Sequence, residues 1–445
     1  MFHNQSRTSS TNFGADPRGK MMRETSGLDP AGTVPPARRR PGSASLRGAA
    51  RVFVDLLDCH LVDSSLLLDL AGQRVLCGAR KSDGDPLPDA VRLRIHNERF
   101  FARVLGDGNL GLGEAYMDGD FTVESGELHV LLTALLRNRI GQRVNSELRT
   151  QLGVLIVQLS NLFQRRQWRN VQKHYDIGTD LFTAFLDDSL TYSCGYAVTA
   201  EDDLETMQFN KLDRISRKLE LQRGDRVLDI GCGFGGLLIH AARHHEVTGV
   251  GITNSADHFH LGTARIVAAH LENRIRLELR DHRSIEGRFD KVVSVGMMEH
   301  LPPGEYRRYF NRIVQVLAPD GLGLVHAIGC GTPQTQHDPF IQKYIFPGSR
   351  QIMLSDVTKE LERHRVAIRD VENIVRHYGY TVLHWLDRFR RNAPALDSIR
   401  YDNTFRRMWE YYLHCGIAAA FASESAVYQV LFARDYAGSM PLKRV

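Results

Sequence analysis

Four apolar runs of strand length recur in the second half of the chain, and stretches of helical periodicity separate them. The runs are RVLDIG at 226–231, VTGVGIT at 247–253, FDKVVSVG at 289–296 and GLGLVHAIG at 321–329. Strands that alternate with helices predict βαβ units and a parallel sheet, with ligands at the carboxyl ends of the strands. Further on, the aromatic-rich stretch 405–415 predicts a helix, and VYQVLFAR at 427–434 predicts a closing strand. This half of the chain is therefore expected to be α/β.

Residues 51–136 follow a different pattern, in which short apolar stretches alternate with turns. VRLRIHN at 91–97 is typical of a strand, and GDGN at 106–109 is a hairpin signal that ends the stretch FFARVLGDGN. We expect a small N-terminal α+β domain here. A chain of 445 residues has room for two or three domains.

Residues 137–170 combine an apolar centre with many arginines and Trp168. Such a basic, partly apolar helix suits the plane of a membrane interface. It equally suits an inter-domain helix that buries its apolar stripe on the protein, and both interpretations stay open. The arginines are Arg137, Arg139, Arg143, Arg149, Arg165, Arg166 and Arg169.

Residues 1–50 carry the whole formal charge excess of the chain. They contain eight basic and three acidic residues, and 8 − 3 = +5 equals the net charge of the full sequence. Ser, Thr, Gly and Pro fill the same stretch, which predicts a disordered basic tail. The tail has either no specific role or a weak attraction to anionic lipid.

The six cysteines are scattered, without a CxxC pair. This spacing predicts neither a metal site nor a disulfide framework, and it favours a reducing, cytoplasmic location. No apolar run approaches the roughly 18 residues that span a bilayer, and the N-terminus lacks the apolar region of a signal peptide. We expect no nucleic-acid partner.

The strongest local signal is the turn RVLDIGCGFGG at 226–236. A buried strand enters a turn in which Gly231, Gly233 and Gly235 let the backbone approach a ligand closely. A dinucleotide fold would need GxGxxG and an acidic residue roughly 20 positions on. Here the spacing is GxGxG, and the second strand ends in Thr253 without a carboxylate. Asp229 can accept a hydrogen bond from an amino-acid ammonium, which favours a methyltransferase that uses S-adenosylmethionine.

Several longer segments resemble the cyclopropane-fatty-acyl-phospholipid synthase family in order and spacing. They are KHYDIGTDLFTAFLDDSLTYSCGY at 173–196, FDKVVSVGMMEHL at 289–301, LVHAIG at 324–329 and DPFIQKYIFPG at 338–348. GLGEAYMDGDF at 111–121 looks like the N-terminal lipid-handling domain of the phospholipid-acting members. The resemblance runs from about residue 90 to 435.

This resemblance implies a Rossmann-like class I methyltransferase core at 171–445 with a helical cap that binds the acyl chain. It also implies domains at 51–136 for lipid handling and 137–170 as a basic linker helix, after the tail at 1–50. The cofactor pocket would be lined by residues of four segments: Tyr192, Ser193, Asp229, Gly231, Cys232, Gly233, Phe234, Gly235, Gly236, Leu237, Thr253, Asn254, His258, Asp281 and His282.

The resemblance further implies a bound bicarbonate as catalytic base. Methyl transfer to an alkene leaves a carbocation, and a base must then remove a proton from the new methyl so that a cyclopropane ring can close. The groups that hold bicarbonate in the family correspond to Cys194, Glu299, His326, Tyr378 and the backbone of Ile328. A buried anion needs donors, which a tyrosine hydroxyl, an imidazole N–H and a backbone N–H can supply. Taken singly, each side chain could instead be an ordinary core or helix-end residue.

Three positions depart from the family pattern: His258 replaces a common glutamine, Ala197 a common aromatic, and Asp120 a usual tryptophan. The implied substrate is an unsaturated phospholipid acyl chain, reached by peripheral association with the inner face of the membrane, and a homodimer is compatible with the resemblance. The alternatives are a relative that methylates the alkene without ring closure and one that binds lipid without catalysis.

Overall fold

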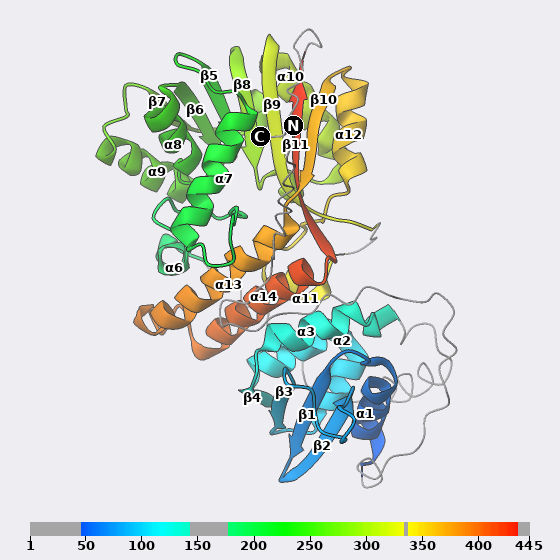
Figure 1. Ribbon diagram of the computed structural model, residues 1–445. Coiled ribbons are helices and arrows are strands. Elements are labelled where there is room, and N and C mark those ends of the chain that lie inside the picture. The colour runs from blue at the N-terminus through cyan, green and yellow to red at the C-terminus, as the bar shows by residue number, and fades with distance from the viewer. Residues whose placement is uncertain (1–45, 143–176, 333–336, 435–445) are drawn as a thin grey trace, which may run out of the picture.

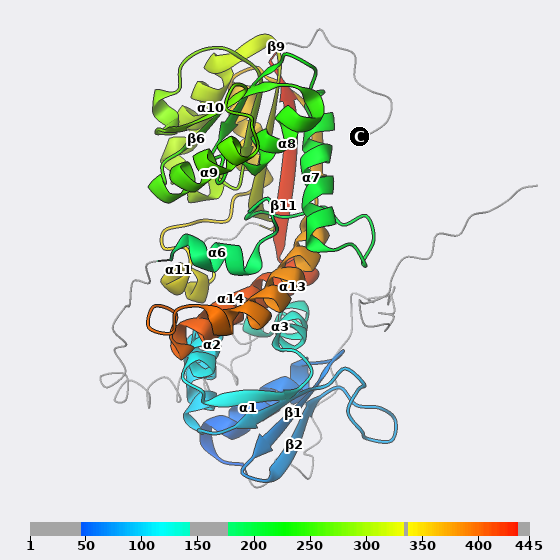
Figure 2. The same ribbon diagram turned by 90° about the vertical axis from the view of Figure 1, so that its left-hand side faces the viewer.

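The computed structural model describes residues 46–142, 177–332 and 337–434. Within these residues the chain forms two separate sheets, and a layer of helices lies between them (Figure 1). The view in Figure 2 shows the same three-part arrangement from the side. The predicted tail 1–50 and the predicted helix 137–170 lie largely outside the described residues.

The larger sheet has seven strands in the order β10-β11-β9-β8-β5-β6-β7. Strands β7, β6, β5, β8 and β9 run parallel to one another, whereas β11 is antiparallel to both β9 and β10. Their bounds are β5 (Arg226–Ile230), β6 (Thr248–Thr253), β7 (Ile275–Leu279), β8 (Phe289–Val295), β9 (Leu317–Cys330), β10 (Ala367–Asn373) and β11 (Ser425–Ala433). The four predicted apolar strands and the predicted closing strand are confirmed.

Helices cover both faces of this sheet, because its strands carry apolar side chains on both sides. One face packs against α7 (Leu204–Lys218), α8 (Gly236–His245) and α9 (Ala256–Ala268), and the other against α10 (Tyr306–Val316) and α12 (Leu354–Arg363). In β5, successive side chains point to opposite faces of the sheet. Val227 packs in the cluster with α7, α8 and α9, and Leu228 packs in the cluster with α10 and α12.

The smaller sheet has the order β2-β1-β3-β4 and forms the N-terminal domain. Its elements are α1 (Gly48–His60), β1 (Ser65–Leu70), β2 (Gln73–Gly78), β3 (Val91–Ile95), α2 (Arg99–Met117), β4 (Phe121–Ser125) and α3 (Leu128–Arg137). The predicted strand at 91–97 is confirmed as β3.

The predicted hairpin at 106–109 is wrong, because these residues lie inside α2. The helix bends at Gly108, whose φ of 56° and ψ of −129° interrupt the helical backbone. On either side of the bend, Phe101, Leu105, Leu112 and Tyr116 are buried at helical spacing. Burial of this face outweighs the local preference of Gly-Asp-Gly-Asn for a turn.

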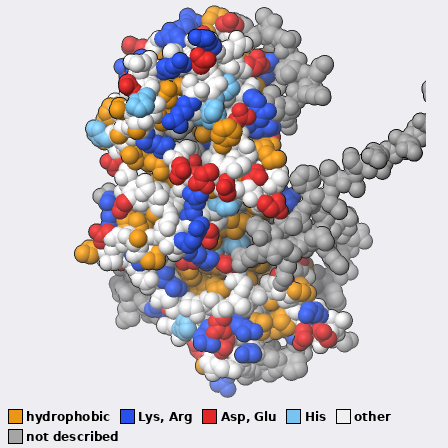
Figure 3. Space-filling model, turned by 60° about the vertical axis from the view of Figure 1, so that its left-hand side comes forward, with side chains coloured by type: hydrophobic (Ala, Val, Ile, Leu, Met, Phe, Trp, Pro, Cys, Tyr) orange, Lys and Arg blue, Asp and Glu red, His pale blue; other side chains and the backbone are white. Residues whose placement is uncertain are grey.

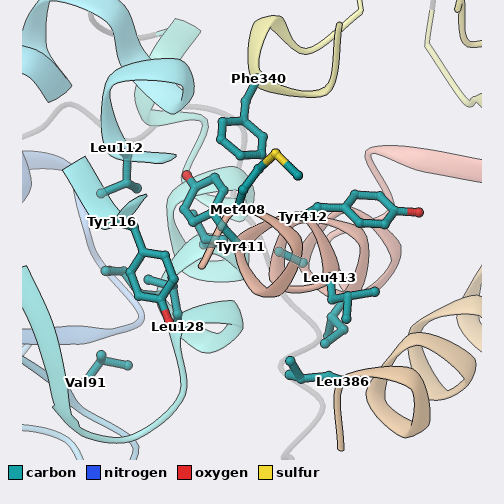
Figure 4. Close-up of a cluster of buried hydrophobic side chains, with 14 of the residues drawn as sticks. Val91, Leu112, Tyr116, Leu128, Phe340, Leu386, Met408, Tyr411, Tyr412 and Leu413 are labelled. Carbon is teal, nitrogen blue, oxygen red and sulfur yellow. The ribbon is translucent and has the colours of Figure 1, made fainter. Parts of the chain in front are cut away.

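The helical layer between the sheets consists of α6 (Thr179–Phe185), α11 (Pro339–Tyr344), α13 (Val375–Asn392) and α14 (Asn403–Phe421). α14 contacts α13 on one side and α2 and α3 of the N-terminal domain on the other. One hydrophobic cluster runs through both parts, and Figure 4 shows Tyr116 and Leu112 beside Tyr411 of α14. The N-terminal domain and the helical layer therefore share a core.

Candidate active site

The turn after β5 forms a cradle of bare backbone at the carboxyl edge of the sheet. The backbone N–H groups of Gly231 and Cys232 both donate to Ile252 O at 3.0 Å, which ties the turn to β6. Gly233 has φ of 51°, and a Cβ added there would meet no atom within 4 Å. At Gly236 an added Cβ would lie 2.8 Å from Ser189 O. The turn is thus open toward Gly233 and closed on the side of Ser189.

Two buried ionisable side chains near this turn, those of Asp229 and Lys211, act on each other electrostatically. Asp229 at the end of β5 is 3% exposed, and Lys211 of α7 is 1% exposed. Burial raises the pKa of Asp229 to about 7, and the Lys211 cation opposes that rise. Burial lowers the pKa of Lys211 to about 8. Because two buried groups with displaced pKa values are typical of functional sites, this pair marks the edge of the sheet as a site.

Residues after β6 form one wall of the cradle. Ser255 caps α9 by accepting a hydrogen bond from His258 N at 3.3 Å, which fixes the first turn of that helix. The His258 ring then packs on Phe234 with 4.5 Å between ring centroids. Thr253 is buried and Asn254 is exposed. His258, Phe234 and Thr253 are thus brought together, with Asn254 at the rim.

Asp281 and His282 follow β7 at the same edge, in the 3-10 helix η2 (His282–Ser284) and the residue before it. Arg283 donates to both Asp281 oxygens at 2.8 Å, and this bond holds the pKa of Asp281 well below its usual range. The Nε2 of His282 is buried without a hydrogen-bond partner among the described residues. His282 thus has an unused polar atom, whereas Asp281 is already fully engaged.

Other predicted cofactor residues have contacts within the protein. Cys232 and Leu237 pack in the apolar cluster between the sheet and α8. Ser193 Oγ accepts a hydrogen bond from Lys211 Nζ at 3.2 Å. The Tyr192 ring lies in the helical layer against Trp385, with centroids 5.2 Å apart.

A second set of groups lies next to the end of β8. Glu299, in the 3-10 helix η3 (Met298–His300), accepts a hydrogen bond from Ile328 N at 3.3 Å through Oε1. Its Oε2 is buried and has no hydrogen-bond partner among the described residues. Burial raises the pKa of Glu299 to about 7, and the backbone hydrogen bonds partly offset the rise. An orphaned buried carboxylate oxygen is costly and points to a ligand.

Cys194 and Tyr378 face the same region. Burial raises the pKa of Tyr378 well above its usual value, and Tyr412, Cys194 and Glu299 all add to this rise. Burial also raises the pKa of Cys194, so its thiol keeps its proton. The Tyr412 hydroxyl lies 2.7 Å from the Tyr192 hydroxyl, and Tyr412 and Tyr378 affect each other's pKa values. The structure thus gathers Cys194, Glu299, Tyr378 and the Ile328 N–H.

His326 lies on β9 two residues before Ile328, on the same face of the strand, and is 1% exposed. Its Nδ1 is 3.3 Å from Gln429 Nε2 on β11. Because the Ile328 N–H donates to Glu299, His326 lies two strand positions from a member of the second set.

Sequence reasoning missed Lys211, Lys218 and Gln429. A usable signal was present in α7, where buried positions repeat every three or four residues and both lysines fall on that buried face. A charged residue inside an apolar stripe is unusual and calls for a partner. Gln429 gave no such signal, because its partners come from two other elements.

Side chains of both charge signs are interspersed on the face shown in Figure 3, with small hydrophobic areas between them. Among the described helices, none is long and apolar enough to cross a membrane.

Comparisons with known proteins identify the relatives of this chain. The family described as mycolic acid cyclopropane synthetase matches residues 163–430. The cyclopropane-fatty-acyl-phospholipid synthase of Escherichia coli K12 is 36% identical over 353 residues, covering 79% of this chain and 90% of that protein. The tuberculostearic acid methyltransferase UfaA1 of Mycobacterium tuberculosis is 33% identical, covering 78% of this chain and 84% of its own.

Among solved structures, the mycolic acid cyclopropane synthase CmaA1 complexed with SAH and CTAB aligns with a TM-score of 0.54 and 27% identity. The alignment covers 59% of this chain and 96% of CmaA1. The cyclopropane synthase MmaA2 from Mycobacterium tuberculosis aligns with a TM-score of 0.55 and 28% identity, again over 59% of this chain.

Proposed function

Because this chain belongs to the cyclopropane synthase family of S-adenosylmethionine-dependent methyltransferases, we propose that it cyclopropanates unsaturated phospholipid acyl chains. The methyl of S-adenosylmethionine is transferred to a cis double bond, a proton is removed with the help of bicarbonate, and the ring closes. One observation carries the proposal: the open glycine turn and the buried set around Glu299 lie at the same edge of one sheet.

The glycine turn suits S-adenosylmethionine, whose sulfonium supplies an electrophilic methyl group. Gly233 leaves open space where a side chain would stand. Asp229 is a buried acid whose charged form is stabilised by the Lys211 cation, and an amino-acid ammonium would stabilise that form further. His258 and Phe234 would pack against the adenine, and the Nε2 of His282, which has no partner among the described residues, would hydrogen-bond to its edge.

The groups around Glu299 suit a small oxyanion that also carries a proton. The Ile328 N–H, the Tyr378 hydroxyl and the Cys194 thiol are donors, and Cys194 and Tyr378 both stay protonated because burial raises their pKa values. Glu299 Oε2 is an acceptor without a partner in the described part of the chain. Glu299 Oε2 would accept a hydrogen bond from the hydroxyl of a bicarbonate held here and so orient the ion, which would supply the basicity that proton removal needs.

The helical layer would exclude water from the reacting carbon. The Phe185 ring packs against those of Trp385 and Trp409, with centroids 5.8 Å away from each. Because a carbocation reacts with any nearby water, aromatic walls around it protect ring closure. We propose that the acyl chain enters along this layer while the enzyme rests on the surface of the membrane.

Expression in Escherichia coli cells that lack their own cyclopropane synthase tests the proposal. Gas chromatography with mass spectrometry of fatty acid methyl esters should show new esters heavier by one CH₂. The Glu299→Gln variant, expressed to the same level, should show far fewer. Absence of any heavier ester from cells that contain folded, S-adenosylmethionine-binding protein would contradict the proposal.

A second candidate function is methylation without ring closure, since UfaA1 is named a methyltransferase and is 33% identical to this chain. Both products gain the same mass when a methylene branch forms, so mass alone does not separate them. Proton NMR of the purified esters does, because cyclopropyl protons resonate upfield of all other acyl protons. A third alternative, lipid binding without catalysis, predicts no calorimetric signal with S-adenosylmethionine.

A further inference from the structure

A chain of buried polar side chains runs from α7 through β11 to His326. Lys218 Nζ donates to Gln429 Oε1 at 2.9 Å, and Gln429 Nε2 lies 3.3 Å from His326 Nδ1. Lys218 is 3% exposed, Gln429 is 0% exposed and His326 is 1% exposed. Gln429 and His326 are direct partners in the β9–β11 register, so their side chains leave the sheet side by side.

The orientation of the Gln429 amide is determined by Lys218. An ammonium group has only donors, so it must face the amide oxygen. If the amide were turned around, its NH₂ would face the ammonium and two donors would meet in a buried place. The NH₂ of Gln429 therefore points to His326, and the amide nitrogen can only donate.

Lys218 itself is firmly held. It lies 2.7 Å from Glu372 Oε2 and 3.2 Å from Asp370 Oδ2. Arg214, on the same helix, also binds Glu372 at 2.8 Å. These ion pairs fix the ammonium and, through it, the amide.

The consequence for His326 concerns its proton. An imidazole nitrogen that accepts a hydrogen bond carries no hydrogen, so in the neutral ring the hydrogen stands on the other nitrogen. Burial, together with the nearby Lys211 and Lys218 cations, lowers the pKa of His326 to about 3, so the ring is neutral at physiological pH.

We propose that Lys218 and Gln429 are positioning residues that hold neutral His326 in its Nε2–H tautomer, so that this ring presents a donor to the oxyanion held by the set around Glu299. The inference rests on the proposed function for the role of that donor, while the tautomer itself follows from the hydrogen-bond chain. Neither residue belongs to the set that would touch the oxyanion.

Gln429→Glu tests the proposal with a side chain of the same size. A carboxylate would still accept from Lys218, but it would also accept from His326, which would move the ring hydrogen to Nδ1. Long-range proton–nitrogen NMR of protein labelled with ¹⁵N only in histidine reports the tautomer. The His326 signal is the one that disappears in His326→Gln. Wild type should show Nε2–H, and Gln429→Glu should show Nδ1–H or a charged ring.

Kinetics provide the second measurement. Losing a preorganised donor to an oxyanion lowers turnover by roughly 10²-fold or more, and the KM for bicarbonate should rise in Gln429→Glu while affinity for S-adenosylmethionine stays unchanged. Gln315→Glu makes the same chemical change at an exposed position of α10 and should leave both readouts as in wild type.

A wild-type spectrum with Nδ1–H, or with both tautomers, would overturn the assignment, even if Gln429→Glu failed to fold. A folded Gln429→Glu protein with a moved hydrogen and wild-type kinetics would overturn the functional part. If wild type made no methylated lipid, the proposed function would fail, yet the spectrum would still decide the tautomer.

Discussion

The substitution Glu299→Gln tests two effects of the Glu299 charge separately: its effect on the stability of the fold and its effect on turnover. Burial raises the pKa of Glu299 from 4.5 to about 7, so the folded protein binds this proton more tightly than the unfolded chain does. The stability that comes from this proton is fully present below pH 4.5 and is lost as the pH rises through about 7. Above that pH the folded protein carries an unfavourable buried charge.

The magnitude follows from about 1.4 kcal/mol for each pKa unit. Relative to a neutral side chain, ionisable Glu299 lowers the free energy of unfolding by about 1 kcal/mol at pH 5 and by about 3 kcal/mol at pH 8. The glutamine of Glu299→Gln would keep an oxygen that accepts from the Ile328 N–H, without the charge. The difference in free energy of unfolding between the variant and wild type should therefore favour the variant by about 2 kcal/mol more at pH 8 than at pH 5.

Urea unfolding at pH 5 and pH 8, in buffers purged of carbon dioxide, measures this difference. Glu272→Gln, at an exposed position before β7, is the control and should have the same effect at both pH values. Turnover of Glu299→Gln at pH 8 should fall on the order of 10²-fold, although the protein is more stable. Depletion of bicarbonate should slow wild type much more than the variant, because both changes affect one step.

Two results would refute this reasoning. A stability difference that does not change with pH would mean that Glu299 is not a raised-pKa carboxyl. Wild-type turnover in the variant, or equal fractional sensitivity of both proteins to bicarbonate, would separate Glu299 from the proton-removal step.

Three other substitutions test the turn, the N-terminal domain and the surface. Gly233→Val places a branched side chain at a φ of 51° and in the open cradle, so calorimetry should show S-adenosylmethionine binding at least about tenfold weaker; equal affinity in a folded variant would exclude this turn. Arg103→Met removes a buried cation that pairs with Asp118 and Asp120 at 2.8 Å. Urea unfolding should therefore show a free energy of unfolding lower by on the order of 3 kcal/mol, whereas a decrease below about 1 kcal/mol would show that the two aspartates do not need this cation. If the predicted helix 137–170 lies on the membrane, changing Arg165, Arg166 and Arg169 together to Gln should weaken salt-sensitive binding to anionic vesicles and leave cofactor affinity unchanged. Vesicle binding that is independent of salt would instead support a helix buried in the protein.

The sequence was sufficient to predict the methyltransferase sheet because its strands are buried on both faces. Continuous apolar runs such as RVLDIG and VTGVGIT allow few other structures, and both became strands within one residue of the prediction. α2 shows the opposite case. There Gly106 and Gly108 suggested a turn; the backbone does leave helical geometry at Gly108, but buried aromatic residues on both sides keep the stretch a bent helix and not a hairpin. Local preference lost to tertiary burial.

The candidate site could be predicted as a set of residues but not as an electrostatic system. The motifs gave Cys194, Glu299 and Tyr378 from three distant segments, and the structure buries them in one region, where Cys194 and Glu299 both raise the pKa of Tyr378. Nothing in a linear motif shows that Glu299 Oε2 lacks a partner within the described residues, or that Asp281 is already occupied by Arg283. The same holds for Asp120, which stands where the resemblance leads one to expect tryptophan. It forms a buried ion pair with Arg103, and no linear motif shows this pair.

α14 connects the N-terminal domain to the candidate site through two adjacent residues. Tyr411 donates to Asn109 Oδ1 of α2 at 2.6 Å, whereas Tyr412 bonds to Tyr192 in the site. Neighbouring positions on a helix point about 100° apart, and Figure 4 shows the two rings directed to different sides. α2 approaches so closely that a Cβ on Gly113 would lie 2.7 Å from the Tyr411 ring. The close packing of α2 therefore fixes the rotation of α14 and with it the place of Tyr412, so the N-terminal domain helps to shape the candidate site.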